Sequence, residues 1–220
     1  EISREIDYAA LDSYLTFGYV PEEFCIFKDV QKLLPGHSLT FKNGKVETRK
    51  YWDFNYVKPV EIKTEAEYIE ELRAQITEAV KIRLISEVPL GAFLSGGVDS
   101  SSIVGIMSKL SDKPVKTFSI GYSGNYQSYQ NELHFAKRMA KEVNAIYHER
   151  LLNVDDLLDF LPRMIHLQDE PIADPVCVPV YYVSKLARDN GIIVAQVGEG
   201  ADELFWGYPS WKTSLKLQNL

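Results

Sequence analysis

A glycine turn that joins an apolar run to a helical pattern constrains the fold of this chain more than any other feature. Residues 88–94 form the apolar run, Ser95, Gly96 and Gly97 form the turn, and apolar side chains then recur at helical spacing from Ile103. This order predicts a strand, a tight turn and a helix. A helix N-terminus exposes unpaired backbone N–H groups and the positive end of the helix dipole, so the junction favours a bound phosphate or pyrophosphate.

The residue types around this turn suit an anion. Gly96 and Gly97 lack the Cβ atoms that would keep an anion away from the main chain. The Asp99 carboxylate suits either Mg²⁺ or the orientation of the turn. Because the loop has no Gly-Lys-[Ser/Thr] sequence, it is not a Walker A motif, and we expect hydroxyl and backbone groups to hold the phosphates. An ordinary turn with a helix N-cap is the structural alternative. The hydroxyl donors are Ser95, Ser100, Ser101 and Ser102.

A second strand, glycine turn and helix start lies near the C-terminus. Residues 191–197 form a nearly continuous apolar run, which is typical of a buried strand in a parallel sheet. Gly198 opens the next turn, and Glu199 and Asp202 are three residues apart, so a helical first turn would place them on one face. Acidic residues are also common at helix N-termini as caps. Because parallel α/β sheets bind ligands at the carboxyl ends of their strands, we expect both junctions to face one site with carboxylates for Mg²⁺.

The two junctions together resemble a known family. Residues 95–100 resemble the pyrophosphate loop of the N-type ATP pyrophosphatases, which adenylylate a substrate with ATP and pass the activated group to a nucleophile. Residues 198–208 resemble the second signature of the glutamine-hydrolysing asparagine synthetases, with Trp206 where that signature usually has glycine. Residues 169–175 and 115–121 resemble further stretches of this family, and the latter resembles its adenine-contacting strand.

This resemblance implies ATP-dependent asparagine synthesis. In that reaction the β-carboxylate of aspartate attacks ATP, pyrophosphate leaves, and glutamine-derived ammonia displaces AMP from β-aspartyl-AMP. The implied cofactors are ATP and Mg²⁺, with Mg²⁺ assigned to Asp99 and Asp202 and catalytic roles assigned to Glu199 and Asp202. The implied ATP and pyrophosphate contacts are Phe93, Leu94, Ser95, Gly96, Gly97, Asp99, Ser100, Ser101, Ile120, Val197 and Gly198.

Two other functions stay open at this point. One is a related amide-forming ligase, either β-lactam-synthetase-like or an amidotransferase that acts on a sugar or peptide carboxylate, because the two motifs indicate adenylylation and say little about the acceptor. The other is a non-catalytic nucleotide-binding module. The intact acids Asp99, Glu199 and Asp202 argue against this module, because a degenerate relative would be expected to have lost at least one of them.

Helices and strands alternate through the middle of the chain. This alternation predicts an α/β fold with a doubly wound parallel sheet, which the resemblance implies is of the adenine-nucleotide alpha-hydrolase type. Thr64 and Glu67 form a capping-box pattern, and Pro162 should kink or restart a helix within residues 155–166. We expect strands near residues 89–94, 115–120, 146–151 and 192–197. We expect helices at residues 99–110, 131–143 and about 177–190.

The N-terminal quarter resembles the end of the glutaminase domain of the same family. Residues 8–17 predict a short helix, and Asn43-Gly44 predicts a hairpin turn between two strands. We therefore expect an α+β glutaminase-domain remnant at residues 1–58 and the N-terminal part of an ATP-pyrophosphatase synthetase domain at residues 59–220. Because the first residue is not the catalytic cysteine of that glutaminase domain, and the family continues beyond the second motif, we expect an internal fragment.

Two segments lack helical or strand periodicity. Residues 54–59 mix aromatic and polar side chains and end in proline, which predicts a linker after the glutaminase remnant. Residues 122–130 are polar and aromatic and contain a Gly-Asn pair, which predicts a mobile loop over the site.

The net charge and the cysteines limit the partners and the cellular compartment that we expect. The formal net charge of −7 argues against a nucleic-acid partner, because phosphate backbones require clustered lysine and arginine. No stretch approaches the roughly 18 apolar residues of a membrane span, so no membrane partner is expected. Cys25 and Cys177 lie far apart and are expected to be reduced thiols in a cytoplasmic protein. The expected partners are aspartate and glutamine-derived ammonia, and a homodimer is compatible with the resemblance.

Overall fold

The computed structural model divides into two compact units, and each unit is described by itself. Each is built from two separate stretches of chain: Glu1–Ile62 with Asp159–Cys177, and Lys63–Leu158 with Val178–Leu220. The residues that the structure describes are 3–54, 62–124 and 132–218. The predicted linker at residues 54–59 and the predicted loop at residues 122–130 lie largely outside these described residues.

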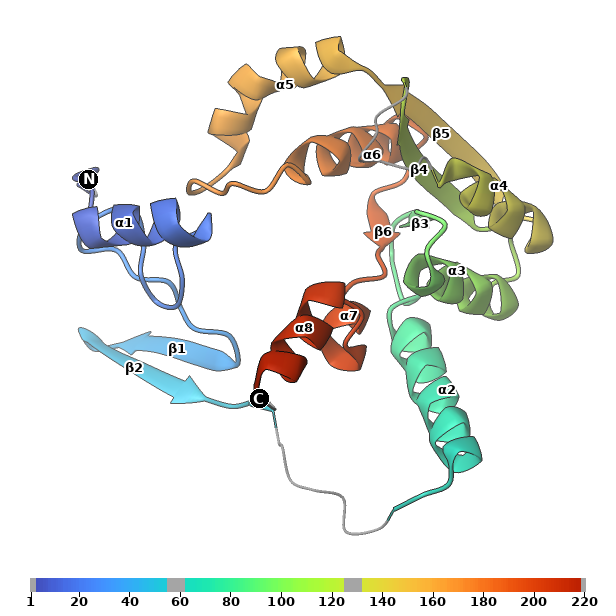
Figure 1. Cartoon of the computed structure of the whole chain (residues 1–220), viewed down its shortest axis with the longest axis horizontal. Coiled ribbons are helices and arrows are strands. Elements are labelled where there is room, and N and C mark those ends of the chain that lie inside the picture. The colour runs from blue at the N-terminus through green and yellow to red at the C-terminus, as the bar shows by residue number, and fades with distance from the viewer. Residues whose placement is uncertain (1–2, 55–61, 125–131, 219–220) are drawn as a thin grey trace. The chain divides into compact units, whose positions relative to one another are not determined.

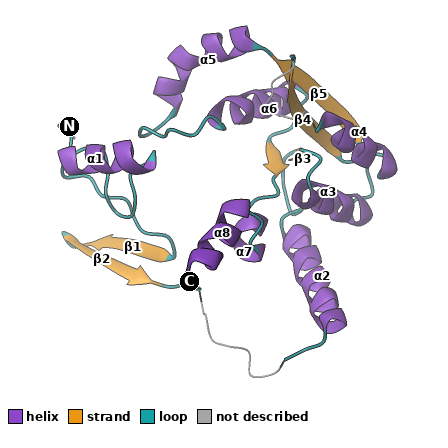
Figure 2. Ribbon diagram, viewed as in Figure 1, coloured by secondary structure: helices purple, strands orange, loops and turns teal. Residues whose placement is uncertain are grey.

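A short helix and a β-hairpin form much of the first unit, as predicted (Figure 2). Helix α1 spans Tyr8–Phe17. Strand β1, His37–Lys42, pairs antiparallel with β2, Lys45–Lys50. The turn residues Asn43 and Gly44 have φ angles of 52° and 77°, which the mirror-image turns of two-residue hairpins require. The side chains of both strands are almost all exposed, so the hairpin itself buries no core.

Two contacts attach the later stretch of the first unit to its N-terminal stretch. The Lys32 ammonium lies 2.9 Å from a carboxylate oxygen of Glu170. The backbone N–H of Ala173 donates a 2.7 Å hydrogen bond to the carbonyl of Gly18. The segment at residues 169–175 therefore packs against N-terminal residues that are far from it in sequence.

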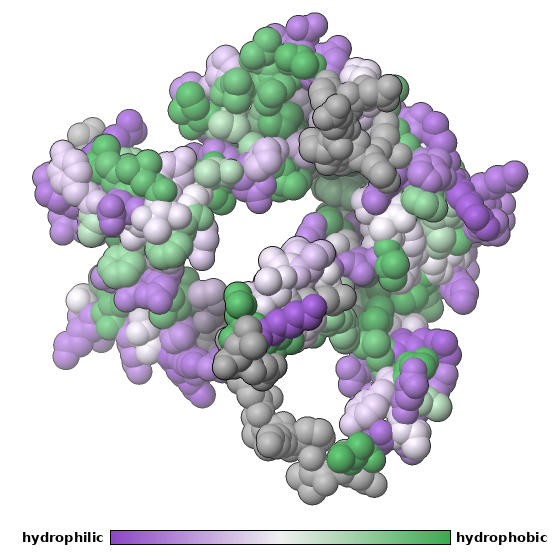
Figure 3. Space-filling model, in the orientation of Figure 1, coloured by the Kyte–Doolittle hydropathy of each residue, from purple (hydrophilic) through white to green (hydrophobic). Residues whose placement is uncertain are grey.

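Helix α5, Val154–Leu167, continues without interruption through Pro162, so of the two predicted outcomes the restart is wrong and the kink stays a prediction. Proline lacks a backbone N–H and so removes one hydrogen bond of the helical ladder. The helix start is also fixed by reciprocal hydrogen bonds between Asn153 and Asp156. Much of the visible surface of α5 is apolar in Figure 3, and the side chain of Ile165 is 73% exposed.

A four-stranded parallel sheet organises the second unit (Figure 1). Its spatial order is β5-β4-β3-β6, and all three neighbouring pairs are parallel. The chain therefore moves outward from β3 in one direction and returns to its other side with β6, and such a switch point is where open α/β sheets bind ligands. The strands are β3 (Leu90–Phe93), β4 (Lys116–Tyr122), β5 (Ile146–Leu152) and β6 (Val194–Gln196).

Helices cover both faces of this sheet, which confirms the predicted doubly wound α/β class. On one face, buried residues from α2, α3 and α4 form a core with β3. On the other face, α6 packs on Phe118 of β4. The predicted capping box at Thr64 and Glu67 starts α2. The helices are α2 (Glu65–Ile82), α3 (Val98–Leu110), α4 (Leu133–Glu142) and α6 (Cys177–Asp189).

Two helices follow β6. Helix α7, Ala201–Phe205, ends at Trp206, which has a left-handed φ of 57°. Helix α8, Pro209–Gln218, is a finding that the sequence reading missed, although proline at a first helical position is a common start signal. Among the described residues, no helix is both long and apolar enough to cross a membrane.

Candidate functional site

The first junction, the turn at residues 95–97 that leads into α3, is closed by hydrogen bonds to its own serine side chains. The backbone N–H of Ser95 donates to the Ser100 hydroxyl at 3.2 Å, and the two hydroxyl oxygens are 2.9 Å apart. The backbone N–H of Gly97 donates to the Ser95 hydroxyl at 3.2 Å. Ser100 is buried, so its hydroxyl serves the loop, whereas Ser95 is exposed and Ser101 is half-buried. The loop shape is thus fixed by the chain itself.

Helix α3 begins directly from this loop. Gly97 is its N-cap and makes no side-chain capping hydrogen bond, and Asp99 lies in its first turn. Leu94, which precedes the loop, is buried, and its backbone N–H donates to the Phe118 carbonyl at 2.9 Å. An uncapped N-terminus held at the end of a buried strand offers backbone N–H groups and a positive dipole end to an anion.

Gly96 and Gly97 each lack a side chain for a different structural reason. A Cβ on Gly96 would lie 2.8 Å from the backbone nitrogen of Ala136 and 2.9 Å from the carbonyl oxygen of Glu132, at the start of α4. Gly96 also has a φ of 94°. A Cβ on Gly97 would meet only the Ser95 hydroxyl, at 3.4 Å. Gly96 therefore serves packing and backbone conformation, and Gly97 leaves the loop open for the close approach of a ligand.

The second junction packs directly on the first. A Cβ on Gly198 would lie 2.8 Å from the backbone nitrogen of Ser100 and 2.9 Å from the carbonyl carbon of Asp99. This approach follows from the sheet, because β3 and β6 are parallel neighbours and both chains leave it at the same edge. The structure thus brings Gly198 to the first turn of α3, where the sequence places Asp99 and Ser100.

The acids of the second junction line the start of α7. Glu199 and Asp202 are exposed, and Asp202 is in the first turn of the helix. Glu203 accepts a 2.7 Å hydrogen bond from the Tyr208 hydroxyl, a contact that the sequence reading did not identify. This hydrogen bond lowers the pKa of Glu203 and raises the pKa of Tyr208 to about 12. Glu203 therefore stays ionised beside Asp202.

Apolar side chains on the α6 face of the sheet form a largely buried cluster that we call the apolar wall. It consists of Phe93 and Ile120 together with the buried residues on which they pack: Phe118, Val183, Ala187 and Ile192. Val197 follows the end of β6 and is 43% exposed. Of the three residues expected near an adenine, the structure therefore joins Phe93 and Ile120 in one cluster, and Val197 lies at the strand end beside Gly198.

The donor set at the junctions fits Mg²⁺ held together with substrate phosphates. Within the described residues, no group of three or more His, Cys, Asp or Glu side chains is arranged to hold a metal. Mg²⁺ is usually held by one or two carboxylates, phosphate oxygens and waters, and does not need an all-protein cage. Asp99, in the first turn of α3, and Asp202, in the first turn of α7, are carboxylates of the kind that such a site uses.

Comparisons with known proteins identify the families that this chain resembles. The asparagine synthase family matches residues 71–220, and the glutamine amidotransferase domain family matches residues 1–52. Asparagine synthetase [glutamine-hydrolyzing] 1 of Bacillus subtilis is 35% identical over 97% of this chain and 33% of its own length. A putative asparagine synthetase [glutamine-hydrolyzing] 2 of Methanocaldococcus jannaschii is 36% identical over 94% of this chain and 40% of its own.

A solved structure also matches part of the chain. This protein, an NH3-dependent NAD synthetase from Campylobacter jejuni, is 18% identical, with a TM-score of 0.39 over 65% of this chain and 60% of its own. The chain spans about a third of the length of the Bacillus relative. Because the asparagine synthase family matches well over half of the residues, the chain belongs to that family.

Proposed function

We propose that this chain carries the nucleotide site of an enzyme that makes asparagine from aspartate, ATP and glutamine-derived ammonia. The observation that carries this proposal is the packing of Gly198 on the first turn of α3, because it brings both signature junctions together. The names of the relatives support the choice of aspartate as the acceptor. Residues 1–58 would belong to a glutaminase-type domain and residues 59–220 to the synthetase domain, in a protein that we expect to form a homodimer.

The residues of the first junction would bind the pyrophosphate part of ATP. Backbone N–H groups at the start of α3 and the exposed Ser95 hydroxyl are the donors, with Ser101 beside them. Leu94 and Gly96 would shape the loop from behind. Fixed donors of this kind stabilise developing negative charge by roughly 3 kcal/mol each. We expect this stabilisation of the departing pyrophosphate to be the largest contribution to the rate.

The adenine would rest on the apolar wall, near Phe93, Ile120 and Val197, with main-chain contacts at Gly198. Asp99 and Asp202 would hold Mg²⁺, which supplies charge neutralisation for the phosphates when it is bound. The aspartate β-carboxylate would attack the α-phosphorus of ATP, so that pyrophosphate leaves and β-aspartyl-AMP forms. Ammonia would then displace AMP and yield asparagine. Glu199 would either deprotonate the attacking ammonium or bind the substrate amine.

The test is pyrophosphate release by the full natural protein, supplied with MgATP and ammonium, with and without aspartate. We expect release that depends strongly on aspartate, together with formation of asparagine and AMP. Release that ignores aspartate but requires another carboxylate would move the function to a different amide-forming ligase. Binding of MgATP without release on any carboxylate would identify a nucleotide-binding module instead.

A further inference from the structure

Arg150 lies beside the apolar wall and outside both junctions. It is on β5, opposite Ile120 of β4 in the parallel register. Side chains at paired positions of neighbouring strands leave the sheet on the same face, because successive residues alternate between faces. Arg150 therefore stands beside Ile120 on the face that α6 covers.

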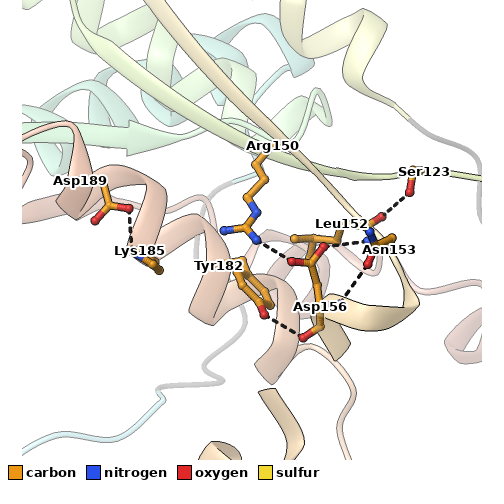
Figure 4. Close-up of polar contacts among 8 residues, drawn as sticks. All are labelled: Ser123, Arg150, Leu152, Asn153, Asp156, Tyr182, Lys185 and Asp189. Carbon is orange, nitrogen blue, oxygen red and sulfur yellow. Dashed lines mark hydrogen bonds and ion pairs between the residues drawn. The ribbon is translucent and has the colours of Figure 1, made fainter. Parts of the chain in front are cut away.

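Three elements meet at this arginine (Figure 4). Its guanidinium lies 2.5 Å from a carboxylate oxygen of Asp156, in the first turn of α5. The guanidinium carbon is also 4.4 Å from the centroid of the Tyr182 ring, which belongs to α6. The Tyr182 hydroxyl closes the set, because it donates a 2.7 Å hydrogen bond to the Asp156 carbonyl. We call Arg150, Asp156 and Tyr182 the arginine clamp.

The carboxylate in the arginine clamp is held in place on both of its oxygens. The oxygen that does not contact Arg150 accepts a 2.9 Å hydrogen bond from the backbone N–H of Asn153. The Asn153 side chain in turn accepts a 3.0 Å hydrogen bond from the backbone N–H of Asp156. The Asp156 side chain is only 16% exposed. A charge-assisted contact with a fixed, shielded partner is stronger than an ordinary surface ion pair.

The arginine clamp is continuous with the apolar wall through α6. Tyr182 directly precedes Val183, and Ala187 follows one turn later on the same helix. Val183 and Ala187 are buried against Phe118, and Ile120 packs on this cluster. A change in the position of Tyr182 would therefore move the helix residues that support the surface under Ile120.

We propose that Arg150 is a positioning residue for the adenine end of the nucleotide. It holds Tyr182, which fixes α6 on the sheet and thereby sets the surface on which the base rests. The proposal rests on the proposed function, because that function takes the apolar wall to be the adenine site. It assigns no contact between Arg150 and ATP.

The test compares Arg150→Met with Lys185→Met in the full natural protein. Lys185 lies on α6 and pairs with Asp189 at 2.7 Å within the helix, so its replacement makes the same charge change outside the arginine clamp (Figure 4). We expect Arg150→Met to raise the Kd for MgATP about fivefold to tenfold, within the range reported for residues that act on a site through packing. Lys185→Met should leave that Kd unchanged.

A second ligand separates positioning of the base from general damage. Magnesium pyrophosphate would contact the two junctions and not the apolar wall, so its Kd should be the same in Arg150→Met and the unmodified protein. Turnover should show a raised KM for ATP with kcat retained. Arg150→Lys, which keeps a cation over the Tyr182 ring, should recover part of the MgATP affinity.

Three results would overturn the inference, and they are distinguishable. Equal MgATP affinity in Arg150→Met and Lys185→Met, with binding in the unmodified protein intact, would overturn the role of Arg150 alone. A fall in kcat and in the number of pyrophosphate sites per chain, at unchanged KM for ATP, would do the same, because it reports a smaller active fraction. Failure of the unmodified protein to bind MgATP would overturn the proposed function and this inference together.

Discussion

Both junctions pass from a strand through a glycine turn into a helix, but they differ in how many contacts with the rest of the chain fix their shape. The first is tied by the Ser95–Ser100 contact, is packed on α4 through Gly96, and leads into the 13-residue helix α3. The second leads into α7, a helix of five residues that ends at a left-handed Trp206 and carries exposed acids. The two junctions meet where Gly198 lies against the backbone of Asp99 and Ser100.

This difference teaches that the two junctions contribute to a site in different ways. A loop whose donors are already oriented needs little reorganisation when it binds an anion, and this preorganisation makes it effective. A short, exposed helix start gains order from what it binds or what packs on it. We therefore expect the first junction to be sensitive to changes in geometry and the second to changes in charge.

The largest expected effect comes from removing a carboxylate charge at either junction. Replacing either carboxylate, in Asp99→Asn or Asp202→Asn, should lower pyrophosphate release by about 100-fold or more, because a fixed charge would be lost where phosphate charge develops. Asp99 is half-buried and Asp202 is exposed, so neither change should alter the unfolding midpoint. Rates are measured with saturating aspartate and ammonium. Substantial activity in either variant would contradict the metal-ligand assignment of that residue.

The next effect tests the geometry of the first junction. Gly96→Ala should destabilise the protein by about 2 to 4 kcal/mol, because it adds a backbone clash to the strain of a positive φ. Gly191 is the matched control, since its φ is 80° but its Cβ would meet nothing within 4 Å. Gly191→Ala should therefore cost only about 1 kcal/mol. Urea unfolding gives the free energy of unfolding of both variants. Equal losses of stability would show that the packing of Gly96 on α4 does not contribute to stability.

A smaller effect tests the end of the second junction. Trp206 combines a left-handed backbone with a ring contact to Trp211, at a centroid distance of 5.6 Å. Trp206→Gly and Trp206→Ala both remove the ring, but only glycine relieves the backbone strain. The glycine variant should thus be more stable than the alanine variant by about 1 kcal/mol, the reverse of their usual order in helices. The usual order, alanine above glycine, would show that Trp206 is not strained.

The smallest expected effect is a pH dependence that lies outside both junctions. His148 stacks on Phe118 at 5.2 Å, and its buried Nε2 has no hydrogen-bond partner among the described residues. Burial first, and then the charge of Lys116, lower the pKa of His148 below its usual 6.5. The unfolded chain therefore binds this proton more readily, and stability should fall as the pH drops through 6.5 towards the folded-state pKa.

His148→Gln gives the measurement for this effect. Removal of the imidazole should flatten the dependence of the unfolding free energy on pH between about 5 and 7, where an ordinary histidine titrates. The unmodified protein and the variant are compared by urea unfolding across that range. Identical slopes would show that His148 does not carry the dependence.

The sequence predicted the features that depend on neighbours along the chain. The Asn43-Gly44 turn and the Thr64–Glu67 capping box are both present, because each is decided within four residues. The strands of the parallel sheet lie at the predicted positions, although β6 is shorter than expected, at Val194–Gln196. Apolar runs mark such strands well, but their ends depend on where the neighbouring strand stops offering hydrogen bonds.

Contacts between segments that are far apart in the chain could not be predicted from the sequence. Nothing local to Gly96 announces that it packs on α4, and the Ser100 hydroxyl was expected to face a phosphate before the structure showed it bonded to Ser95. The arginine clamp likewise joins residues that are up to 32 positions apart, from Arg150 to Tyr182. Such details require the packed structure, because they depend on the side chains that three elements present at one point.

The most direct test of the central claim is hydrogen exchange with and without a non-hydrolysable MgATP analogue. If the two junctions form one nucleotide site, amides at residues 95–101 and 198–202 should both become protected, with the larger gain at the second junction. The amides of the β1–β2 hairpin should not change. Protection confined to the first junction, or found away from both, would contradict the claim that the packing at Gly198 joins them into a single site.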